Sequence, residues 1–188
     1  MPRKASRQLQ DRILKSAQAL WRERGEKGLT LRGVARAAGT TTTTVYKRFR
    51  NRAALLAALA DHAHQRLVAD LTSAKSMEEV YRRHLRFAEK NPREYQLLFG
   101  AMWTETFGRV RPVQTWVLTA LSARFGGQPE DYLDAHAALF LATHGAASLI
   151  TFAPSHRASA AVRDRCIAVC DTLVKHVGDF RKATGPFE

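Results

Sequence analysis

The apolar residues of this chain recur every three or four positions, in segments separated by residues that start or stop helices. The first segment contains Leu9, Ile13 and Ala17 and can end at Gly25. No part of the sequence alternates polar and apolar residues as a half-buried strand would. The pattern therefore predicts an all-α protein of about nine helices.

Capping signals place several of the helix starts. Thr30 can cap a short helix that Gly39 would end, and Asn51 can cap a long one. Ser76 has Glu79 three positions on, which is the pattern of a capping box, and Asn91 with Glu94 repeats it. These signals predict helices that begin just after each cap.

Proline and glycine mark the later helices. Pro112 is expected to start a helix that ends at Gly126, and Pro129 a long helix that ends before Pro154. The last helix is expected over residues 158–177, whereas the basic arm at residues 2–6 is expected to be disordered. A chain of 188 residues is long enough to bury a core. We expect two domains, residues 1–52 and residues 53–188.

The positive charge of the chain is concentrated near its start. Residues 1–60 hold 14 Lys and Arg against 3 Asp and Glu, so their net charge is 14 − 3 = +11. Residues 61–188 hold 16 against 14, a net charge of +2. This asymmetry favours a polyanionic partner for the first third, with nucleic acid ahead of an anionic membrane. A basic face that only keeps the chain soluble is the alternative.

Residues 30–50 have the pattern of a helix-turn-helix. Ala35 is small where two helices must cross closely, and Gly39, four residues on, suits a tight turn that needs positive φ. Val34, Ala38 and Val45 can form the buried seam between the helices. The spacing alone is only moderately specific, because Ala and Gly four residues apart are common in proteins.

Five consecutive threonines, Thr40 to Thr44, follow the turn. Thr41 can cap a third helix over residues 42–48, and threonine otherwise forms helices poorly. In a recognition helix the first turn meets the bases, where a hydroxyl can donate or accept and a methyl can contact thymine. The basic pair Lys47-Arg48 follows, which favours this interpretation over a neutral run on a tolerant surface.

Residues 12–60 resemble the DNA-binding domain of the TetR family of bacterial transcriptional regulators. The resemblance rests on Thr30, "AAGT", Thr41, "VYKRF", Arg52 and "LLAAL", which follow in the family's order. It implies a DNA-binding role for Thr41, Thr42, Thr44, Tyr46 and Arg52. Thr30, Lys47 and Arg48 are further candidate DNA-binding residues in the same segment. Lys47 and Arg48 stand where many members have an aromatic or histidine pair, so the surface here is more basic.

The same resemblance implies that the rest of the chain binds a small-molecule effector and forms a homodimer. An apolar or aromatic effector would suit a pocket with His84, Arg83 or Arg86 as a polar group. The candidate pocket residues are His84, Phe87, Tyr95, Phe99, Trp103, Phe107, Trp116 and Phe140. Each of these aromatic residues could equally be ordinary core.

A dimer through the last two long helices is expected because both carry apolar stripes. The candidate interface residues are Ala137, Leu141, His144, Ser148, Val162, Cys166, Val169 and Leu173. Cys166 and Cys170 are four residues apart and badly placed for a disulfide, so a thiol sensor is a minor alternative.

The sequence contains no apolar run long enough to span a bilayer and no secretory signal, so a cytoplasmic protein without a membrane partner is expected. No catalytic motif, cofactor motif or metal-ligand cluster is found in the sequence. The predicted function is a ligand-released repressor that binds a palindromic, double-stranded DNA operator as a dimer. The alternatives are a general architectural DNA-binding protein and a helical enzyme.

Overall fold

The computed structural model describes residues 2–100, 111–153 and 155–180, and within them the protein contains ten α-helices, one 3₁₀ helix and no strand. The predicted all-α class is therefore confirmed. The first four helices are α1 (Pro2–Gly28), α2 (Leu31–Ala37), α3 (Thr42–Tyr46) and α4 (Arg52–Thr72). The others are α5 (Met77–Lys90), α6 (Pro92–Phe99), α8 (Arg111–Phe125), η2 (Pro129–Tyr132), α9 (Leu133–Thr151), α10 (His156–Lys175) and α11 (Val177–Phe180).

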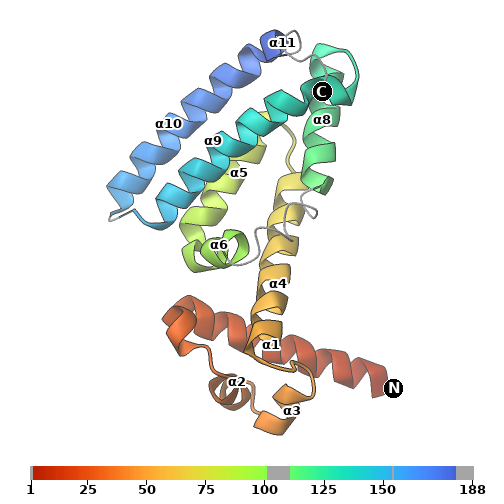
Figure 1. The fold of residues 1–188 in the computed structure, drawn as a ribbon, viewed down its shortest axis with the longest axis vertical. Coiled ribbons are helices and arrows are strands. Elements are labelled where there is room, and N and C mark those ends of the chain that lie inside the picture. The colour runs from red at the N-terminus through yellow and green to blue at the C-terminus, as the bar shows by residue number, and fades with distance from the viewer. Residues whose placement is uncertain (1, 101–110, 154, 181–188) are drawn as a thin grey trace, which may run out of the picture.

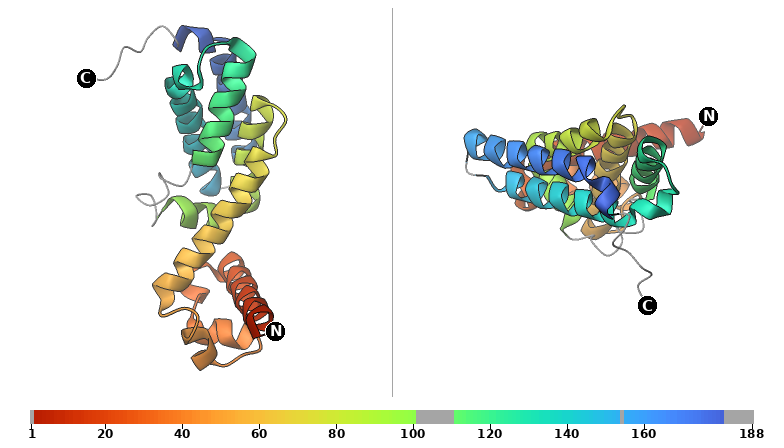
Figure 2. Two further views of the ribbon diagram at one scale, coloured as in Figure 1. Left: turned by 90° about the vertical axis from the view of Figure 1, so that its right-hand side faces the viewer. Right: turned by 90° about the horizontal axis from the view of Figure 1, so that it is seen from above.

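Helices α1 to α3 form a small head at one end of the molecule, and α4 runs from this head into a larger bundle (Figure 1). In the bundle α9 and α10 lie side by side (Figure 2), and α5 packs against both of them. The helix-turn-helix of the head and the end of α10 therefore lie near opposite ends of the molecule (Figure 1).

The molecule has two hydrophobic cores, and α4 contributes to both. The head core contains Ile13, Val34 and Val45, each with no exposed surface, and it includes Leu55 and Leu59 of α4. Farther along α4, Ala63, Leu67 and Leu71 belong to the core of the bundle. Because one helix is shared, a shift of α4 in the bundle would also move the head. The division of domains at residue 52 stays a prediction.

Four of the predicted caps form as expected. The Thr30 hydroxyl accepts from the amide of Gly33 at 3.0 Å, and the Asn51 side chain accepts from the amide of Ala54 at 2.8 Å. Thr41 and Ser76 cap α3 and α5 in the same way. Local sequence therefore sets these helix starts.

The two predicted capping boxes are wrong in their acidic halves. Glu79 accepts from the amide of Lys75, one residue before Ser76. The Asn91 side chain makes no cap, and Glu94 is drawn instead into ion pairs with α1 and α4. For Glu94, two positively charged guanidinium groups are stronger partners for the carboxylate than the neutral backbone amide of Asn91 would be.

Three boundaries also differ from expectation. The structure continues α1 back to Pro2, so the expected disordered arm is wrong. Gly25, with φ of 63°, has a non-helical backbone and ends the first helical segment of α1 at a kink, as expected, and a short second segment follows it to Gly28. The segment from Pro129 opens as a 3₁₀ turn and becomes α-helical only at Leu133. Helix α3 ends at Tyr46 and is shorter than predicted.

Candidate nucleic-acid interface and effector cavity

The turn between α2 and α3 has the geometry that the sequence predicts. Gly39 has φ of 59°, a conformation that side chains with a Cβ rarely adopt, and a Cβ there would have open space around it. The amide of Thr40 donates to the carbonyl of Ala35 at 2.9 Å, and Ala35 is buried where the two helices meet. Gly39 is therefore required by backbone conformation and not by crowding.

Within the threonine run, Thr41 and Thr44 differ from Thr42 and Thr43 in their side-chain hydrogen bonds. The Thr41 hydroxyl accepts from the amide of Thr44 at 3.2 Å and lies 2.9 Å from the Thr44 hydroxyl. These two residues therefore hold the start of α3. No side-chain hydrogen bond among the described residues involves Thr42 or Thr43, of which Thr43 is exposed and Thr42 half-buried. Their hydroxyls therefore take no part in the hydrogen bonds that hold the described part of the head together.

The rest of α3 presents a polar, basic surface. Tyr46 is 52% exposed and Lys47 is exposed, whereas Arg48 is partly buried and interacts within the chain. Val45 anchors the opposite side of α3 in the head core, as predicted, and Phe49, which follows α3, is buried in the same core. Arg32 and Arg36 of α2 are also exposed. A polyanion approaching α3 would thus meet cations from both helices of the motif.

Arg52 is used inside the head. Its guanidinium donates to the carbonyl of Leu29 at 3.2 Å and to the carbonyl and carboxylate of Glu26 at 3.0 Å and 3.3 Å. These bonds fix the segment between α1 and α2, just before the Thr30 cap. A phosphate contact by Arg52 remains a prediction, and the structure adds a supporting role for this residue that the sequence analysis missed.

The head is joined to the bundle through the buried carboxylate of Glu94, which is only 4% exposed. It accepts from Gln18 at 2.6 Å and Arg22 at 3.0 Å, both on α1, and from Arg66 on α4 at 2.9 Å. Burial acts to raise the pKa of Glu94, but the hydrogen bonds from Arg22 and Gln18 and the charges of Arg22 and Arg66 outweigh it and lower the pKa. Glu94 is therefore a charged contact that holds α1, α4 and α6 together.

Next to Glu94 on α6, Tyr95 faces the interior of the bundle. Its hydroxyl lies 2.9 Å from His84 Nε2 and 2.8 Å from His144 Nδ1, so the three side chains form a hydrogen-bonded row across α5, α6 and α9. Phe99 packs on the Tyr95 and His144 rings, with centroids 4.6 Å and 4.5 Å away. His144 is thus part of this interior row, and its expected place in a dimer interface stays a prediction.

Two adjoining pockets lie between α4, α5, α8 and α9, and five residues form walls of both. These shared residues are Leu71, His84, Val113, His136 and Phe140. The predicted pocket residues His84 and Phe140 thus come together, with Phe99 in the second pocket. Tyr95 lines a separate, more open pocket with His144 and Ser148. His136 and His64 also line these pockets, and neither position could be predicted from sequence because both depend on how the helices pack.

Several predicted pocket residues lie elsewhere. Phe87 turns away from the cavity toward α4, where it lies 5.7 Å from the Arg66 guanidinium. Trp116 is partly buried against the bundle core. Arg83 is tied to Asp70 and Glu79, and Arg86 lines an outer groove, so neither supplies the expected polar group. Trp103 and Phe107 lie outside the described residues.

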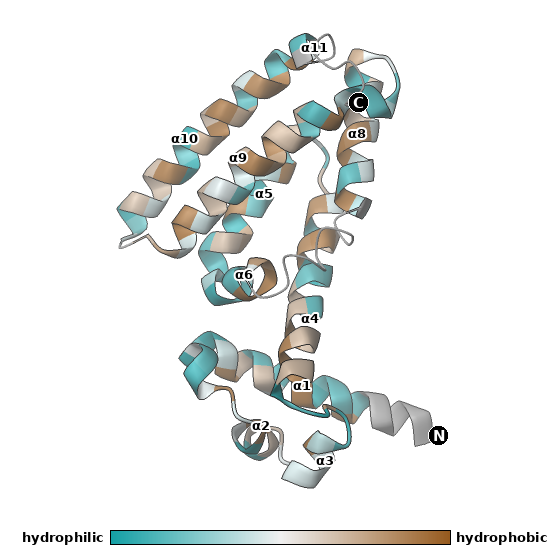
Figure 3. Cartoon of the chain, viewed as in Figure 1, coloured by the Kyte–Doolittle hydropathy of each residue, from teal (hydrophilic) through white to brown (hydrophobic). Residues whose placement is uncertain are grey.

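An exposed apolar stripe runs along α9. Leu141 and Leu149 are each 64% exposed and Phe152 is 76% exposed, although all three are large hydrophobic residues. Val169 of α10 is 51% exposed, and Val162 and Leu173 are half-buried. Hydrophobic residues recur along both α9 and α10 (Figure 3). Of the remaining candidate interface residues, Ala137 is exposed and Ser148 half-buried. Exposure of this kind is typical of a surface that another protein covers.

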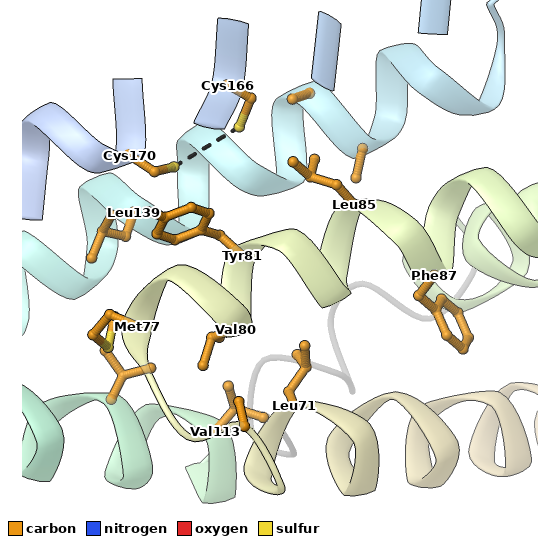
Figure 4. Packing of buried hydrophobic residues seen from close by; sticks show 14 of the residues in the cluster. Leu71, Met77, Val80, Tyr81, Leu85, Phe87, Val113, Leu139, Cys166 and Cys170 are labelled. Atoms are coloured by element: carbon orange, nitrogen blue, oxygen red, sulfur yellow. Dashed lines mark hydrogen bonds between the residues drawn. The ribbon is translucent and has the colours of Figure 1, made fainter. Parts of the chain in front are cut away.

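Cys166 is not part of that stripe. It is buried, its thiol donates to the carbonyl of Ala142 at 3.5 Å, and its sulfur lies 3.9 Å from that of Cys170 (Figure 4). Both cysteines are free thiols in the core above Tyr81 and Leu85 (Figure 4). The assignment of Cys166 to a dimer interface is therefore wrong, because the apolar stripe predicted for α10 has an inward half as well as an outward half.

Neither a metal centre nor a membrane span emerges from the described residues. No three of their His, Cys, Asp and Glu side chains gather as the ligands of a metal ion would. None of their helices combines the length and apolar character needed to cross a membrane.

A family model described as bacterial regulatory proteins of the tetR family matches residues 13–59. This segment covers α2 and α3 and includes most of α1 and the start of α4. Comparison with curated protein sequences finds no match.

Solved structures share the fold over most of the chain. A protein of unknown function from a Rhodococcus species is 23% identical, with a TM-score of 0.69 over 89% of this chain and 94% of that one. A TetR variant from Acinetobacter baumannii in complex with minocycline is 17% identical, with a TM-score of 0.67 over 91% and 97%. The regulator PfmR from Thermus thermophilus is 17% identical, with a TM-score of 0.58 over 87% and 97%.

The resemblance of residues 12–60 to the TetR family is thereby confirmed by the family model over residues 13–59, and the solved structures show a shared fold for the chain. The chain has a TetR-like fold, with an N-terminal helix-turn-helix and a helical C-terminal domain.

Proposed function

We propose that this chain, with its TetR-family helix-turn-helix and TetR-like fold, is a transcriptional repressor that binds a palindromic operator as a homodimer and is released by a small molecule. The observation that carries the proposal is the first turn of α3, where Thr42 and Thr43 have no side-chain hydrogen bonds to other described residues and adjoin Lys47. Residues 1–60, which contain the head and the start of α4, carry a net charge of +11. Such a surface suits base contacts flanked by phosphate contacts.

The decisive experiment is selection of bound fragments from random double-stranded DNA. A regulator of this kind should return one palindrome, because two copies of α3 related by a twofold axis read the two half-sites. Fragments bound without a shared sequence would favour an architectural protein instead. No enrichment at all would contradict DNA binding and leave a helical enzyme as the remaining alternative.

The effector part of the proposal is supported by the cavity between α4 and α9 and by its position. Its walls include α4, which also belongs to the head core, so a ligand that moves α4 would change the spacing of the two heads of a dimer. Two proteins of similar fold are described in complex with minocycline and resorcinol. By linkage, a ligand that weakens DNA binding is itself weakened by DNA to the same extent.

The exposed stripe on α9 predicts the oligomeric state. Wild-type protein should be a dimer by light scattering at micromolar concentration, because Leu141 and Leu149 then leave water. Leu141→Glu with Leu149→Glu should give a monomer, since carboxylates facing each other across the twofold axis would be costly to bury. Tyr46→Glu is the matched control, because it places the same charge on another exposed hydrophobic side chain, in the head, and should leave the mass of a dimer. A wild-type monomer would contradict the prediction.

Sequence choice is expected to depend on Thr42. Thr42→Val keeps the shape and one methyl but removes the hydroxyl, so binding to the selected operator should weaken by roughly 1 kcal/mol while binding to scrambled DNA stays nearly constant. Thr44→Val also removes a partner of Thr41, so some loss of head stability should accompany any change in binding. The measurement is fluorescence anisotropy with both DNAs at two salt concentrations, together with thermal unfolding. If Thr42→Val has the same ratio of affinities for operator and scrambled DNA as wild type, Thr42 does not contact the bases, and Tyr46 and Lys47 are the next candidates for that contact.

A further inference from the structure

An open groove lies between α4 and α5 on the outside of the bundle. Its volume is about 480 Å³, which is within the range of small-molecule sites, roughly 300–1,000 Å³. Its walls come from the middle of α4 and from the last turn of α5, close to the point where α6 begins. The groove therefore has room for a small organic molecule.

The groove is lined by three cations from two helices. Arg66 belongs to α4, and Arg86 and Lys90 belong to α5. Because Arg86 and Lys90 are four residues apart, they share a face of α5 and are offset by about 6 Å along its axis. Both are exposed, and neither makes an ion pair with another described residue. Their two charges have no counter-charge within this part of the chain.

The other polar groups of the walls do not offset these cations. Asp70 is the one acidic residue there, and its carboxylate is paired with Arg83 at 3.0 Å. The Asn91 side chain accepts from Arg22 at 3.2 Å and donates to the carbonyl of Phe87 at 3.1 Å. The groove thus keeps an excess of positive charge, which favours an anionic ligand.

Arg66 is held at the wall of the groove by two contacts. Its Nη1 donates to Glu94 Oε2 at 2.9 Å, and its guanidinium carbon lies 5.7 Å from the centroid of the buried Phe87 ring. The bond to Glu94 is its only hydrogen bond among the described residues, and its side chain is 37% exposed. Arg66 therefore has further N–H groups with which it could bind an anion from solvent.

The arrangement of the cations favours phosphate groups as the ligand. A phosphate has several strong acceptor oxygens and matches the planar fork of a guanidinium in a bidentate contact. Two cations one helical turn apart, with a third on the facing helix, suit two linked phosphates better than a single one.

We propose that this groove binds a small molecule with a diphosphate group, held by Arg66, Arg86 and Lys90. The inference does not depend on the proposed function, because binding is a property of the free protein. Since Arg66 is also a partner of Glu94, the diphosphate and the Glu94 carboxylate compete for one guanidinium. The groove is thereby connected to the contact that holds α1, α4 and α6 together.

Isothermal titration calorimetry on the full chain at constant ionic strength tests the inference with pyrophosphate, orthophosphate, succinate and ADP. Pyrophosphate should bind about tenfold more tightly than orthophosphate or succinate, because it alone has two linked phosphates for the three cations. ADP should keep the affinity of pyrophosphate, because the open groove admits the organic part. Pyrophosphate binding without ADP binding would contradict an organic diphosphate as the ligand.

Because the head is basic as well, matched variants are needed to locate the site. Arg86→Gln and Lys90→Gln should each weaken pyrophosphate binding by about two- to fivefold, which is the effect of losing one exposed ion pair. Arg82→Gln removes the same charge one turn earlier on α5, outside the groove walls, and Lys47→Gln removes it in the head. Both controls should bind pyrophosphate as wild type does, and thermal unfolding shows that each variant is folded.

Glu94→Gln tests the share of Arg66. It removes the carboxylate that competes for this guanidinium, so pyrophosphate should bind more tightly than to wild type. Unchanged or weaker binding in a folded Glu94→Gln would exclude Arg66 from the site. Equal weakening in Arg82→Gln, Lys47→Gln and the groove variants would show general attraction to a basic chain. That result, equal affinities for pyrophosphate and orthophosphate, or no pyrophosphate binding would each overturn the inference.

Discussion

Glu94→Ala is expected to lower the free energy of unfolding by about 3 kcal/mol, at the lower end of the range for removal of one partner from a buried ion pair. The carboxylate is 4% exposed and is bonded by Gln18, Arg22 and Arg66. Its loss leaves two guanidinium groups without their partner, although side-chain exposures of 46% and 37% let water solvate them in part. Urea unfolding at neutral pH, followed by circular dichroism, measures the difference.

Glu94→Gln and Glu23→Ala are the matched variants. Glutamine keeps the shape and can still accept a hydrogen bond, so it should fall between wild type and Glu94→Ala. Glu23 pairs with Arg24 on the surface, where both side chains are more than half exposed, and its removal should cost under about 0.5 kcal/mol. Equal stability of Glu94→Ala and Glu23→Ala would show that the contact between α1, α4 and α6 is not energetically important.

The sign of the pH dependence follows from the lowered pKa of Glu94. An unfolded glutamate titrates near about 4.3, so the stabilisation from Glu94 is complete above that pH and is lost as pH falls toward the lower pKa of the folded state. Wild type and Glu94→Gln should therefore converge in stability in acid. A difference between them that is constant with pH would mean that the charge of Glu94 contributes nothing.

The parts of the fold that depend on neighbours in sequence were predictable. Thr30, Thr41 and Asn51 cap their helices through amides three residues away, and Gly39 adopts positive φ as the turn demands. The seam of the helix-turn-helix also followed from helical spacing, because Val34 and Val45 can be buried only on one side of each helix.

The contacts between distant segments were not predictable. Glu94 stands at the position of a capping acid, and nothing local shows that its partner Arg22 lies 72 residues earlier. The same limit hid the pocket position of His136, which depends on α4, α5 and α8 enclosing it. For α10, periodicity identified an apolar stripe but not which half faces inward, so Cys166 was placed on the wrong side.

The row of His84, Tyr95 and His144 leads to the second large effect, a loss of stability in mild acid. His84 is buried, and burial lowers its pKa to about 3, with a smaller contribution from the nearby His144. An unfolded histidine has a pKa near 6.5. Between these values the unfolded chain binds a proton that the folded chain refuses, so stability falls with falling pH by about 1.4 kcal/mol per unit.

Lowering the pH from 6.5 to about 4.5 should therefore lower the unfolding free energy of wild type by about 2–3 kcal/mol through His84. Above pH 6.5 the stability due to the neutral His84 side chain is fully present. This window lies above the range in which Glu94 titrates. Burial also lowers the pKa of His136 and His144, so both add to the wild-type slope with the same sign. A substitution at His84 is needed to isolate its share.

His84→Gln removes the titrating group and keeps a side chain that can reach the Tyr95 hydroxyl, so stability should depend less on pH in this variant by up to about 1.4 kcal/mol per unit. His156→Gln, at the exposed start of α10, is the control and should follow the wild-type slope. Urea unfolding at several pH values between about 4.5 and 7.5 gives each slope as the change in unfolding free energy with pH. If His84→Gln keeps the full wild-type slope, the protons taken up on unfolding bind at His136 and His144, and the buried end of the row is not what makes the fold acid-sensitive.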